Sequence, residues 1–309
     1  MRHRIETTVS NLQGCFSRDR APILTVESGD TIICRTLDAG WGLDPFAEDA
    51  GAKRIPLESR KDPVHDRGHC LVGPIAVRGA QPGQTLEVQL QEIVPEAVGM
   101  TWVGEVKEFL PRLGVEEFYG IGWRIDWEGR TARSASGHSV AVAPFLGVMG
   151  VAPAAPGVHP TRPPRRVGGN MDCKELTAGS ALYLPIEVPS ALFSFGDGHA
   201  AQGDGEVGGT AIECGMQRIE LSLTVRDTPS IDWPQADTPA GWLTFGFDEN
   251  LESATVIALN AMLDLLVQRL TISRPEALAL ASVAVDLRVT QIANGTLGVH
   301  ARLPHNAIT

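Results

Sequence analysis

Apolar and polar side chains alternate through much of the first three quarters of the sequence. The stretches QTLEVQLQEIV (residues 84–94), SALYLPIEV (180–188) and RIELSLTV (218–225) carry an apolar residue at almost every second position. A period of two places these residues on one face of a β-strand. Turn-forming residues at 81–84 and 178–180 predict hairpins between such strands. The pattern therefore predicts mainly β structure, with antiparallel sheets arranged as a β-sandwich or a barrel-like fold.

The pattern changes near residue 250. Residues 252–270 have apolar side chains at helical spacing, at Val256, Leu259, Met262, Leu263, Leu266 and Leu270. A second helix is predicted from Ser273, which can cap it, to Val285. The alternating segment that follows contains Asn294-Gly295, which predicts the turn of a hairpin.

These patterns also predict how the chain is organised. Residues 1–248 are expected to form a mainly β body. Residues 249–309 are expected to form a C-terminal α/β part, in which a terminal β hairpin packs on the helical segment. Because no change of composition marks a linker between the two, residues 1–309 are predicted to be a single unit.

Charge and cysteine content exclude several classes of partner. The chain has 37 acidic and 26 basic side chains and a formal net charge of −11, which disfavours binding to nucleic acid and to anionic membranes. The uncharged run at 140–158 contains three prolines, which would break a membrane-spanning helix. Five dispersed cysteines argue against a disulfide framework, and the first residues contain no apolar run typical of a signal peptide. We therefore expect a cytoplasmic protein.

The segment FGDGHAAQGDGE, residues 195–206, concentrates acidic side chains and one imidazole among glycines. Its spacing fails as a dinucleotide-binding loop, as a phosphate-binding loop and as an EF-hand. Carboxylates and imidazole without paired thiolates suit zinc, manganese or a similar divalent ion. An acidic turn whose side chains cap their own backbone is an equally good interpretation. The residues at glycine-flanked positions are Asp172, Asp197, His199, Asp204, Glu206 and Glu213.

Two nucleophile patterns are weaker. Ser139 lies in an approximate nucleophile elbow, but Pro144 follows where a helix is needed. Cys173 is followed by Lys174 and Glu175, but adjacent residues of a strand point to opposite faces and cannot converge on one substrate. A buried structural cysteine is the preferred interpretation of Cys173.

Several stretches resemble the acetamidase/formamidase family of amide hydrolases. These are GHCLVGPIAVRGAQPGQTLEV, FLGVMGVAP, PPRRVGGNMDCKEL, GSALYLPIEVPSALFSFGDGHAAQGDGEVGGTAIE and ALASVAVDLRVTQIANGTLGV, which together extend over most of residues 68–300. The resemblance implies a mainly β fold, hydrolysis of formamide or acetamide to the carboxylate and ammonia, and a divalent metal, commonly zinc. Residues 38–66 match the family pattern least, so they leave the amide substrate open.

The resemblance also implies roles for particular residues. Asp172, His199 and His69 are the predicted metal ligands, and Asp197, Glu213 and Gln202 are reserve ligands or residues that orient the ligands. Glu206 or Asp204 is the predicted acid/base that would protonate the leaving nitrogen, and Asn170 is the predicted donor to the oxyanion. Glu206 as a mere orienting partner of His199, and Asn170 as a turn residue, remain alternatives.

Three functions follow. The first is metal-dependent hydrolysis of a small linear amide, in which a divalent ion polarises the carbonyl and lowers the pKa of a bound water to roughly 7. The second is hydrolysis of a cyclic amide (a lactam) or another amide by the same groups. The third is a non-enzymatic β protein that binds a divalent metal. Homo-oligomer formation is expected as well. Core packing or burial in an interface is preferred over a pocket-wall role for Trp102, Trp123 and Trp127.

Overall fold

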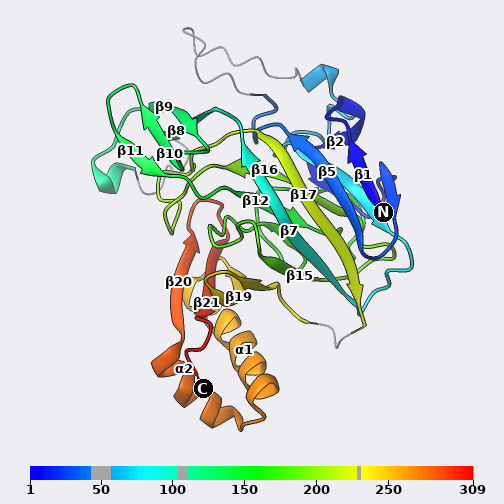
Figure 1. Cartoon of the computed structure of the whole chain (residues 1–309), viewed down its shortest axis with the longest axis vertical. Coiled ribbons are helices and arrows are strands. Elements are labelled where there is room, and N and C mark those ends of the chain that lie inside the picture. The colour runs from blue at the N-terminus through cyan, green and yellow to red at the C-terminus, as the bar shows by residue number, and fades with distance from the viewer. Residues whose placement is uncertain (43–56, 104–109, 228–230, 309) are drawn as a thin grey trace.

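The computed structural model describes residues 1–42, 57–103, 110–227 and 231–308. Most of the regular secondary structure is β-strand, and two α-helices follow near the C-terminus (Figure 1). The largest sheet has nine strands. Their order is β1 (Arg2–Ile5), β5 (Asp30–Thr36), β17 (Met216–Arg226), β7 (Thr85–Pro95), β15 (Ala181–Pro185), β18 (Gln235–Thr238), β19 (Gly241–Asp248), β21 (Leu297–Leu303) and β20 (Asp286–Gln291).

A six-stranded sheet packs against the body of the first. It contains β14 (Gly168–Asn170), β12 (Phe145–Gly150), β16 (Phe193–His199), β6 (Leu71–Val77) and β2 (Leu12–Gln13), with β4 (Leu24–Val26) paired to β6. Side chains from both sheets, such as Ile75 and Phe195 from one and Leu86 and Leu221 from the other, belong to one buried core. The predicted mainly β class with packed antiparallel sheets is therefore confirmed.

Smaller elements complete the body. A four-stranded sheet contains β11 (Ser139–Ala141), β10 (Thr131–Ser134), β9 (Tyr119–Asp126) and β8 (Val98–Val103), and β13 (His159–Pro160) pairs with β3 (Cys15–Phe16). Short 3-10 turns occupy Val9–Asn11, Leu57–Ser59 and Pro111–Leu113.

The three alternating stretches of the sequence correspond to β7, β15 and β17, which are neighbours in the large sheet. The predicted hairpins at 81–84 and 178–180 are wrong. The first of these turns leads from β6 to β7, and the second lies between β14 and β15, so in both cases the flanking strands belong to different sheets. Apolar faces on both sheets must meet in one core, which a connection between sheets achieves as well as a hairpin within one sheet.

The C-terminal residues extend the large sheet and cover it with helices. β20 and β21 pair antiparallel around a loop that contains Asn294 and Gly295, as predicted. α1 (Leu251–Leu270) packs on β19 and β21. α2 (Arg274–Ala284) is capped by Ser273, whose side chain accepts a hydrogen bond from the Glu276 N–H (3.4 Å).

The buried face of α1 differs from the predicted one. Val256 and Leu270 are 52% and 38% exposed, whereas Ala254 and Ala258 are fully buried. The cause is Gly246 of β19, where an added Cβ would lie 2.0 Å from the Ala254 carbonyl oxygen. Because only small residues permit this approach of helix to strand, they set the rotation of the helix. α1 is long and apolar enough to cross a membrane by length and composition, but it packs here as a helix that covers a sheet.

Candidate active site

The Gly-Asp-Gly-His pattern is part of strand β16, and the segment 195–206 is therefore not a loop throughout. Asp197 and His199 are two residues apart and share one face of the strand. Gly196 and Gly198, on either side of Asp197 in the sequence, face the opposite side of the strand, where other backbone segments lie close. A Cβ on Gly196 would lie 2.3 Å from the carbonyl oxygen of Cys70, and one on Gly198 would lie 2.5 Å from that of Cys214. The glycines thus let packed backbone lie behind the strand while both polar side chains point forward.

Three further carboxylates converge on this face from separate segments. His199 Nε2 lies 3.3 Å from Asp197 Oδ1 and 3.2 Å from Glu213 Oε1. Asp172 follows β14, Glu206 follows β16, and the ligand atoms of Asp172, His199 and Glu206 lie within 4.8 Å of one another. All five residues are buried. We call these five residues, Asp172, Asp197, His199, Glu206 and Glu213, the carboxylate cluster.

Gln202 determines which nitrogen of His199 faces the cluster. The Gln202 Nε2 donates a hydrogen bond to the carbonyl oxygen of Asp172 (2.8 Å), and this bond orients the side-chain amide. The Gln202 Oε1 then accepts a hydrogen bond from His199 Nδ1 (2.9 Å). With the proton on Nδ1, the lone pair of Nε2 points at the carboxylates of Asp197 and Glu213. That arrangement requires a cation or a second proton between them. Gln202 therefore holds His199 with Nε2 toward the carboxylates, which is the orientation that a metal ligand would need.

Backbone geometry at the cluster is unusual. The φ angles of Asp172, Asp197 and Glu206 are 50°, 60° and 45°, in the left-handed region that residues other than glycine rarely adopt. Such conformations persist where surrounding contacts enforce them, and they are concentrated at functional sites. Gly147 of β12 lies directly against the cluster, because a Cβ there would be 2.5 Å from an Asp197 oxygen and 2.6 Å from Asp172 Oδ1.

Burial and mutual repulsion shift the acidities. Burial, and then the charge of Asp197, raise the pKa of Asp172 to about 8. Burial would also raise the pKa of Asp197, but the neighbouring His199 and His69 lower it to about 2. Burial and the charge of Asp172 raise the pKa of Glu206 well above its ordinary value. Burial would lower the pKa of His199, but the carboxylates of Glu213 and Asp197 raise it well above the usual range. The carboxylates of the cluster therefore favour the uptake of protons or the binding of a cation.

Unsatisfied buried atoms show that the cluster fits a divalent cation. Asp172 Oδ1, Glu213 Oε2, Asn170 Oδ1 and His69 Nδ1 are buried and have no hydrogen-bond partner. Buried polar groups are normally paired, because an unpaired one costs about 1–3 kcal/mol. Four carboxylates with one imidazole supply oxygen and nitrogen ligands suited to zinc or manganese.

The carboxylate cluster lies at a pocket of about 680 Å³. His69, Asn170 and Trp102 also line this pocket. Trp102 therefore belongs to a pocket wall, the role that the sequence interpretation ranked below core packing or interface burial, whereas Trp123 is buried in the core. Trp127 packs against that core.

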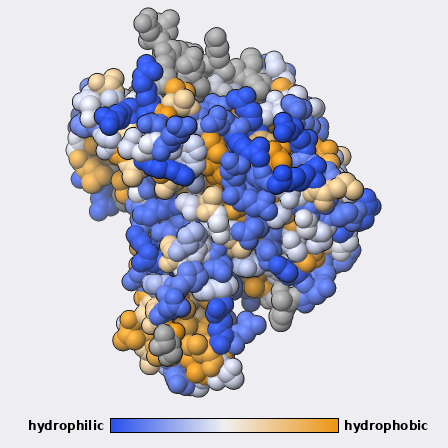
Figure 2. All heavy atoms as spheres, viewed as in Figure 1, coloured by the Kyte–Doolittle hydropathy of each residue, from blue (hydrophilic) through white to orange (hydrophobic). Residues whose placement is uncertain are grey.

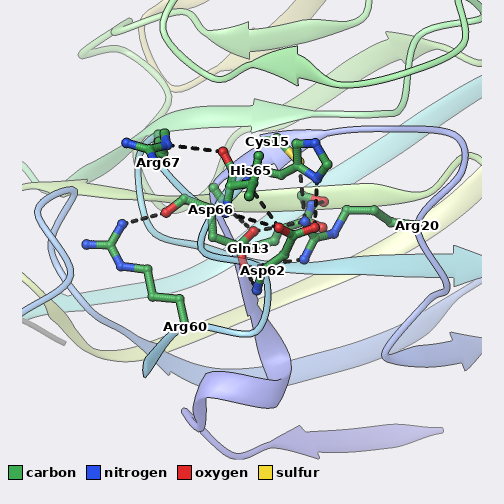
Figure 3. Close-up of polar contacts among 12 residues, drawn as sticks. Gln13, Cys15, Arg20, Arg60, Asp62, His65, Asp66 and Arg67 are labelled. Atoms are coloured by element: carbon green, nitrogen blue, oxygen red, sulfur yellow. Dashed lines mark hydrogen bonds and ion pairs between the residues drawn. The ribbon is translucent and has the colours of Figure 1, made fainter. Parts of the chain in front are cut away.

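Part of the pocket wall comes from residues 60–69, next to the N-terminal strands. Buried Asp66 links this segment to the N-terminal residues. Its carboxylate accepts hydrogen bonds from the Gly14 N–H (3.1 Å) and from Arg20 (2.9 Å) (Figure 3). Its other oxygen accepts from the Asp62 N–H (2.9 Å). Residues 43–56, in the part of the sequence that resembles the family least, lie outside the described residues.

The predicted site residues do not all meet. Asp172 and His199 lie together. Asp197 and Glu213, which were predicted only as reserve ligands, lie directly beside His199, at 3.3 Å and 3.2 Å. His69 lines the pocket, but among the described residues it is in neither group of ligand atoms that includes His199. Asp204 points elsewhere and forms ion pairs with Lys174 (3.1 Å) and Arg288 (2.6 Å). Asp204 therefore lies outside the carboxylate cluster, and Glu206 is the one of the two predicted acid/base residues that belongs to it.

Sequence reasoning missed Asn294. Its side-chain amide donates to Asp172 Oδ2 (2.8 Å) from the loop between β20 and β21. The Asn-Gly pair was interpreted only as a hairpin turn. A usable signal was present, because the stretch ALASVAVDLRVTQIANGTLGV, which contains this residue, is one of those that resemble the family.

Fold and site together define a mainly β protein in which a buried carboxylate and imidazole cluster, suited to a divalent ion, lies at a pocket. The model of the acetamidase/formamidase family matches residues 5–159 and 154–234, so the chain belongs to that family. The resemblance inferred from the sequence is confirmed.

Individual proteins agree with this assignment. An acetamidase from Bacillus halodurans is 28% identical, with a TM-score of 0.83 over 98% of this chain and 97% of that one. A Thermoanaerobacter tengcongensis protein described as a predicted acetamidase/formamidase is 26% identical, with a TM-score of 0.84 over 98% and 96% of the two chains. A candidate formamidase of Schizosaccharomyces pombe is 28% identical over 258 residues. That match covers 65% of this chain but only 60% of the relative's length.

Proposed function

We propose that this chain hydrolyses a small linear amide, with formamide and acetamide as the reference substrates, and that a divalent metal, zinc first among the candidates, serves as cofactor. The observation that carries the proposal is the carboxylate cluster, with its unsatisfied buried oxygens, at a pocket. Family membership supports the reaction class. The names of the relatives, acetamidase and formamidase, support the choice of substrates.

Asp172, Asp197, His199 and Glu213 would hold the ion. A divalent ion in such a site polarises the amide carbonyl and lowers the pKa of water, which makes a poor electrophile and a poor nucleophile reactive together. Gln202 and Asn294 keep His199 and Asp172 in place through the hydrogen bonds described above.

Glu206 is the proposed acid/base. Its carboxyl group lines the pocket, and a ligand atom of it lies within 4.8 Å of those of Asp172 and His199. It would accept the proton that water loses on attack and would deliver it to the leaving nitrogen, so that amide and water become carboxylic acid and ammonia. The raised pKa of this group agrees with a carboxyl that carries a proton at the moment of donation.

Asn170 is the proposed donor to the developing oxyanion. It ends β14, is 2% exposed and lines the same pocket. A side-chain amide held in a buried wall can donate an N–H to the carbonyl oxygen without the cost of reorganising solvent.

Ammonia release tests the proposal directly. Formamide, acetamide and a small lactam would be offered to the protein as purified, after chelation and after return of zinc or manganese. We expect release from the linear amides that chelation abolishes and metal restores. His199→Ala should lose turnover and keep its fold, while the control His305→Ala, at a distant histidine, should keep both.

Three outcomes would contradict parts of the proposal. Absence of ammonia under every metal condition would favour a metal-binding protein without this activity. Release that survives complete metal removal would refute the metal role. Turnover of the lactam alone would replace the substrate class.

We also propose that the chain forms a homo-oligomer through its C-terminal part. Leu278 and Val283 of α2, and Leu287 of β20, are 46%, 83% and 48% exposed. Apolar atoms gather at this end of the molecule in Figure 2. Clustered exposed apolar side chains commonly mark protein interfaces. Sedimentation of the wild type and of Val283→Lys tests this, since a monomeric wild type would refute it.

A further inference from the structure

A second group of ligand-type side chains lies next to the carboxylate cluster along the chain. Cys173 directly follows Asp172, yet it does not line the pocket into which Asp172 points. Cys173 is fully buried and its thiol donates a hydrogen bond to Glu175 Oε2. Fully buried His300 of β21 lies near the same carboxylate oxygen. Lys174, between them, turns away to pair with Asp204 (3.1 Å). Adjacent residues therefore diverge, as expected, while residues two apart meet.

The distances among these three side chains match a metal site. Cys173 Sγ lies 3.4 Å and His300 Nε2 lies 3.6 Å from Glu175 Oε2, and all three ligand atoms lie within 4.8 Å of one another. Tetrahedral zinc, with bonds of about 2.3 Å to sulfur and about 2.0–2.1 Å to nitrogen and oxygen, separates its ligands by about 3.3–3.6 Å. Both of these separations to Glu175 fall in that range, and the third, between Cys173 Sγ and His300 Nε2, is no more than 4.8 Å.

His300 supplies an independent indication of a ligand. Its Nδ1 is hydrogen-bonded to Thr290 Oγ1 (2.8 Å), whereas Nε2 is buried and has no hydrogen-bond partner. At 3.6 Å, Glu175 is too far for a hydrogen bond to Nε2. A histidine oriented through one nitrogen, with the other left unpaired, is the usual arrangement of a metal ligand.

The charges balance once a dication is present. A thiolate and a carboxylate neutralise two positive charges, so a loaded site would not repel Arg288, whose Nη1 lies 3.7 Å from Glu175 Oε1. Arg288 also has its own partner in Asp204 (2.6 Å). The sulfur ligand favours zinc over magnesium, calcium or manganese.

We propose that Cys173, Glu175 and His300 bind a zinc ion in a second site, separate from the carboxylate cluster. A water molecule completes the coordination from the shallow hollow that Glu175 lines beside Thr177 and Gln202. The ion joins the segment that follows Asp172 to strand β21. It thereby fixes the hairpin whose loop carries Asn294 onto Asp172. We call Cys173, Glu175 and His300 the thiolate site.

Cobalt substitution tests the thiolate site without any amide substrate. The metal-free protein would be titrated with Co²⁺ and its near-ultraviolet absorption recorded, because a thiolate bound to cobalt gives a charge-transfer band that oxygen and nitrogen ligands do not. We expect the band in the wild type and in Cys34→Ser, where another buried cysteine is replaced. We expect its loss in Cys173→Ser and in His300→Gln. Zinc content should fall by one ion per chain in the same two variants.

The result separates this site from the proposed function. His199→Ala should keep the band even though turnover is lost, and Cys15→Ser, at a cysteine that lines the pocket, should keep it too. Absence of the band in the wild type would overturn the proposal, as would its persistence in Cys173→Ser. If Cys173→Ser does not fold, His300→Gln and the wild-type spectrum decide the question.

Discussion

Two neighbouring residues, Asp172 and Cys173, belong to two different buried clusters. The carboxylate cluster combines four carboxylates with one imidazole and lies at a pocket of about 680 Å³. The thiolate site combines sulfur, oxygen and nitrogen, and both Cys173 and His300 are fully buried. Catalytic metal sites keep a position open for substrate, whereas structural sites are closed and often contain sulfur. The large pocket agrees with the chemistry proposed for the first cluster, and the sulfur ligand and deep burial of the second agree with its proposed role in joining two segments of the fold.

The two clusters also differ in charge. The thiolate site becomes neutral when one dication binds. The carboxylate cluster keeps excess negative charge with one dication, so one of its carboxyl groups is driven to hold a proton. In the cluster without an ion, burial and repulsion already raise the pKa values of Glu206 and Asp172. An acid/base is thus available beside the proposed metal position only in the carboxylate cluster.

Gly147→Ala is expected to have the largest effect on the carboxylate cluster while leaving the thiolate site unchanged. The added Cβ would lie 2.5 Å and 2.6 Å from oxygens of Asp197 and Asp172, so the carboxylates must separate. We expect amide turnover to fall below detection while the cobalt–thiolate band persists. Ammonia release and the Co²⁺ spectrum measure the two effects. Gly203→Ala is the matched control, because a Cβ there meets nothing within 4 Å. Wild-type turnover in Gly147→Ala would contradict the proposed site.

Glu206→Gln should have the next largest effect. Removal of an acid/base typically lowers kcat by about 10²–10⁴-fold, equivalent to about 3–5 kcal/mol in the activation barrier. Because glutamine has nearly the same shape, KM and thermal unfolding should change little. Steady-state kinetics with formamide and acetamide measure this. A variant that retains most of its kcat would leave Glu206 only an orienting role.

A matched pair of substitutions sharpens the comparison further. Gln202→Leu removes the partner of His199 Nδ1, and Thr290→Val removes the partner of His300 Nδ1. Loss of such a partner weakens metal binding by about 10–100-fold, or about 1.4–2.7 kcal/mol. We expect each variant to weaken only its own site in a competition titration with a chelator. Equal weakening of both sites by either variant would show that the clusters are not independent.

Asp204→Asn should have the smallest effect. The Asp204 side chain is 26% exposed and pairs with Lys174 and Arg288 outside the carboxylate cluster. Partly exposed ion pairs stabilise a fold by about 1 kcal/mol or less. Urea unfolding should show a change of that size, with turnover close to that of the wild type. A fall in kcat comparable with that of Glu206→Gln would restore Asp204 as a candidate acid/base.

Much of the fold could be predicted from local patterns. Period-two alternation identified β7, β15 and β17, and Ser273 marked the start of α2, because a strand face and a helix cap depend on residues near one another in sequence. Which strands pair and which face of α1 is buried could not be predicted in this way. Those features depend on contacts such as that of Gly246 with Ala254, between elements that the sequence alone does not bring together.

The candidate site shows the same division. The unusual density of glycine, acidic residues and histidine at 195–206 identified Asp197, His199 and Glu206 as residue types suited to a metal. Asn294 lies 122 positions from its partner Asp172 and was interpreted only as a turn residue. The approach of Cys173 and His300 to the same carboxylate, that of Glu175, could likewise not be predicted, since the sequence indicates only a buried structural cysteine.

The sequence by itself determined that this chain is mainly β, that two helices come late, and that acidic side chains and one imidazole are concentrated at residues 195–206. These properties follow from residue type and short-range spacing. Only the tertiary structure decided that Asp172 and Cys173 face different clusters, that Asp204 belongs to a separate ion-pair network, and that the final hairpin contributes to the pocket site. The physical reason is that ligand geometry depends on distances of a few ångströms between segments whose approach is set by packing of the whole core.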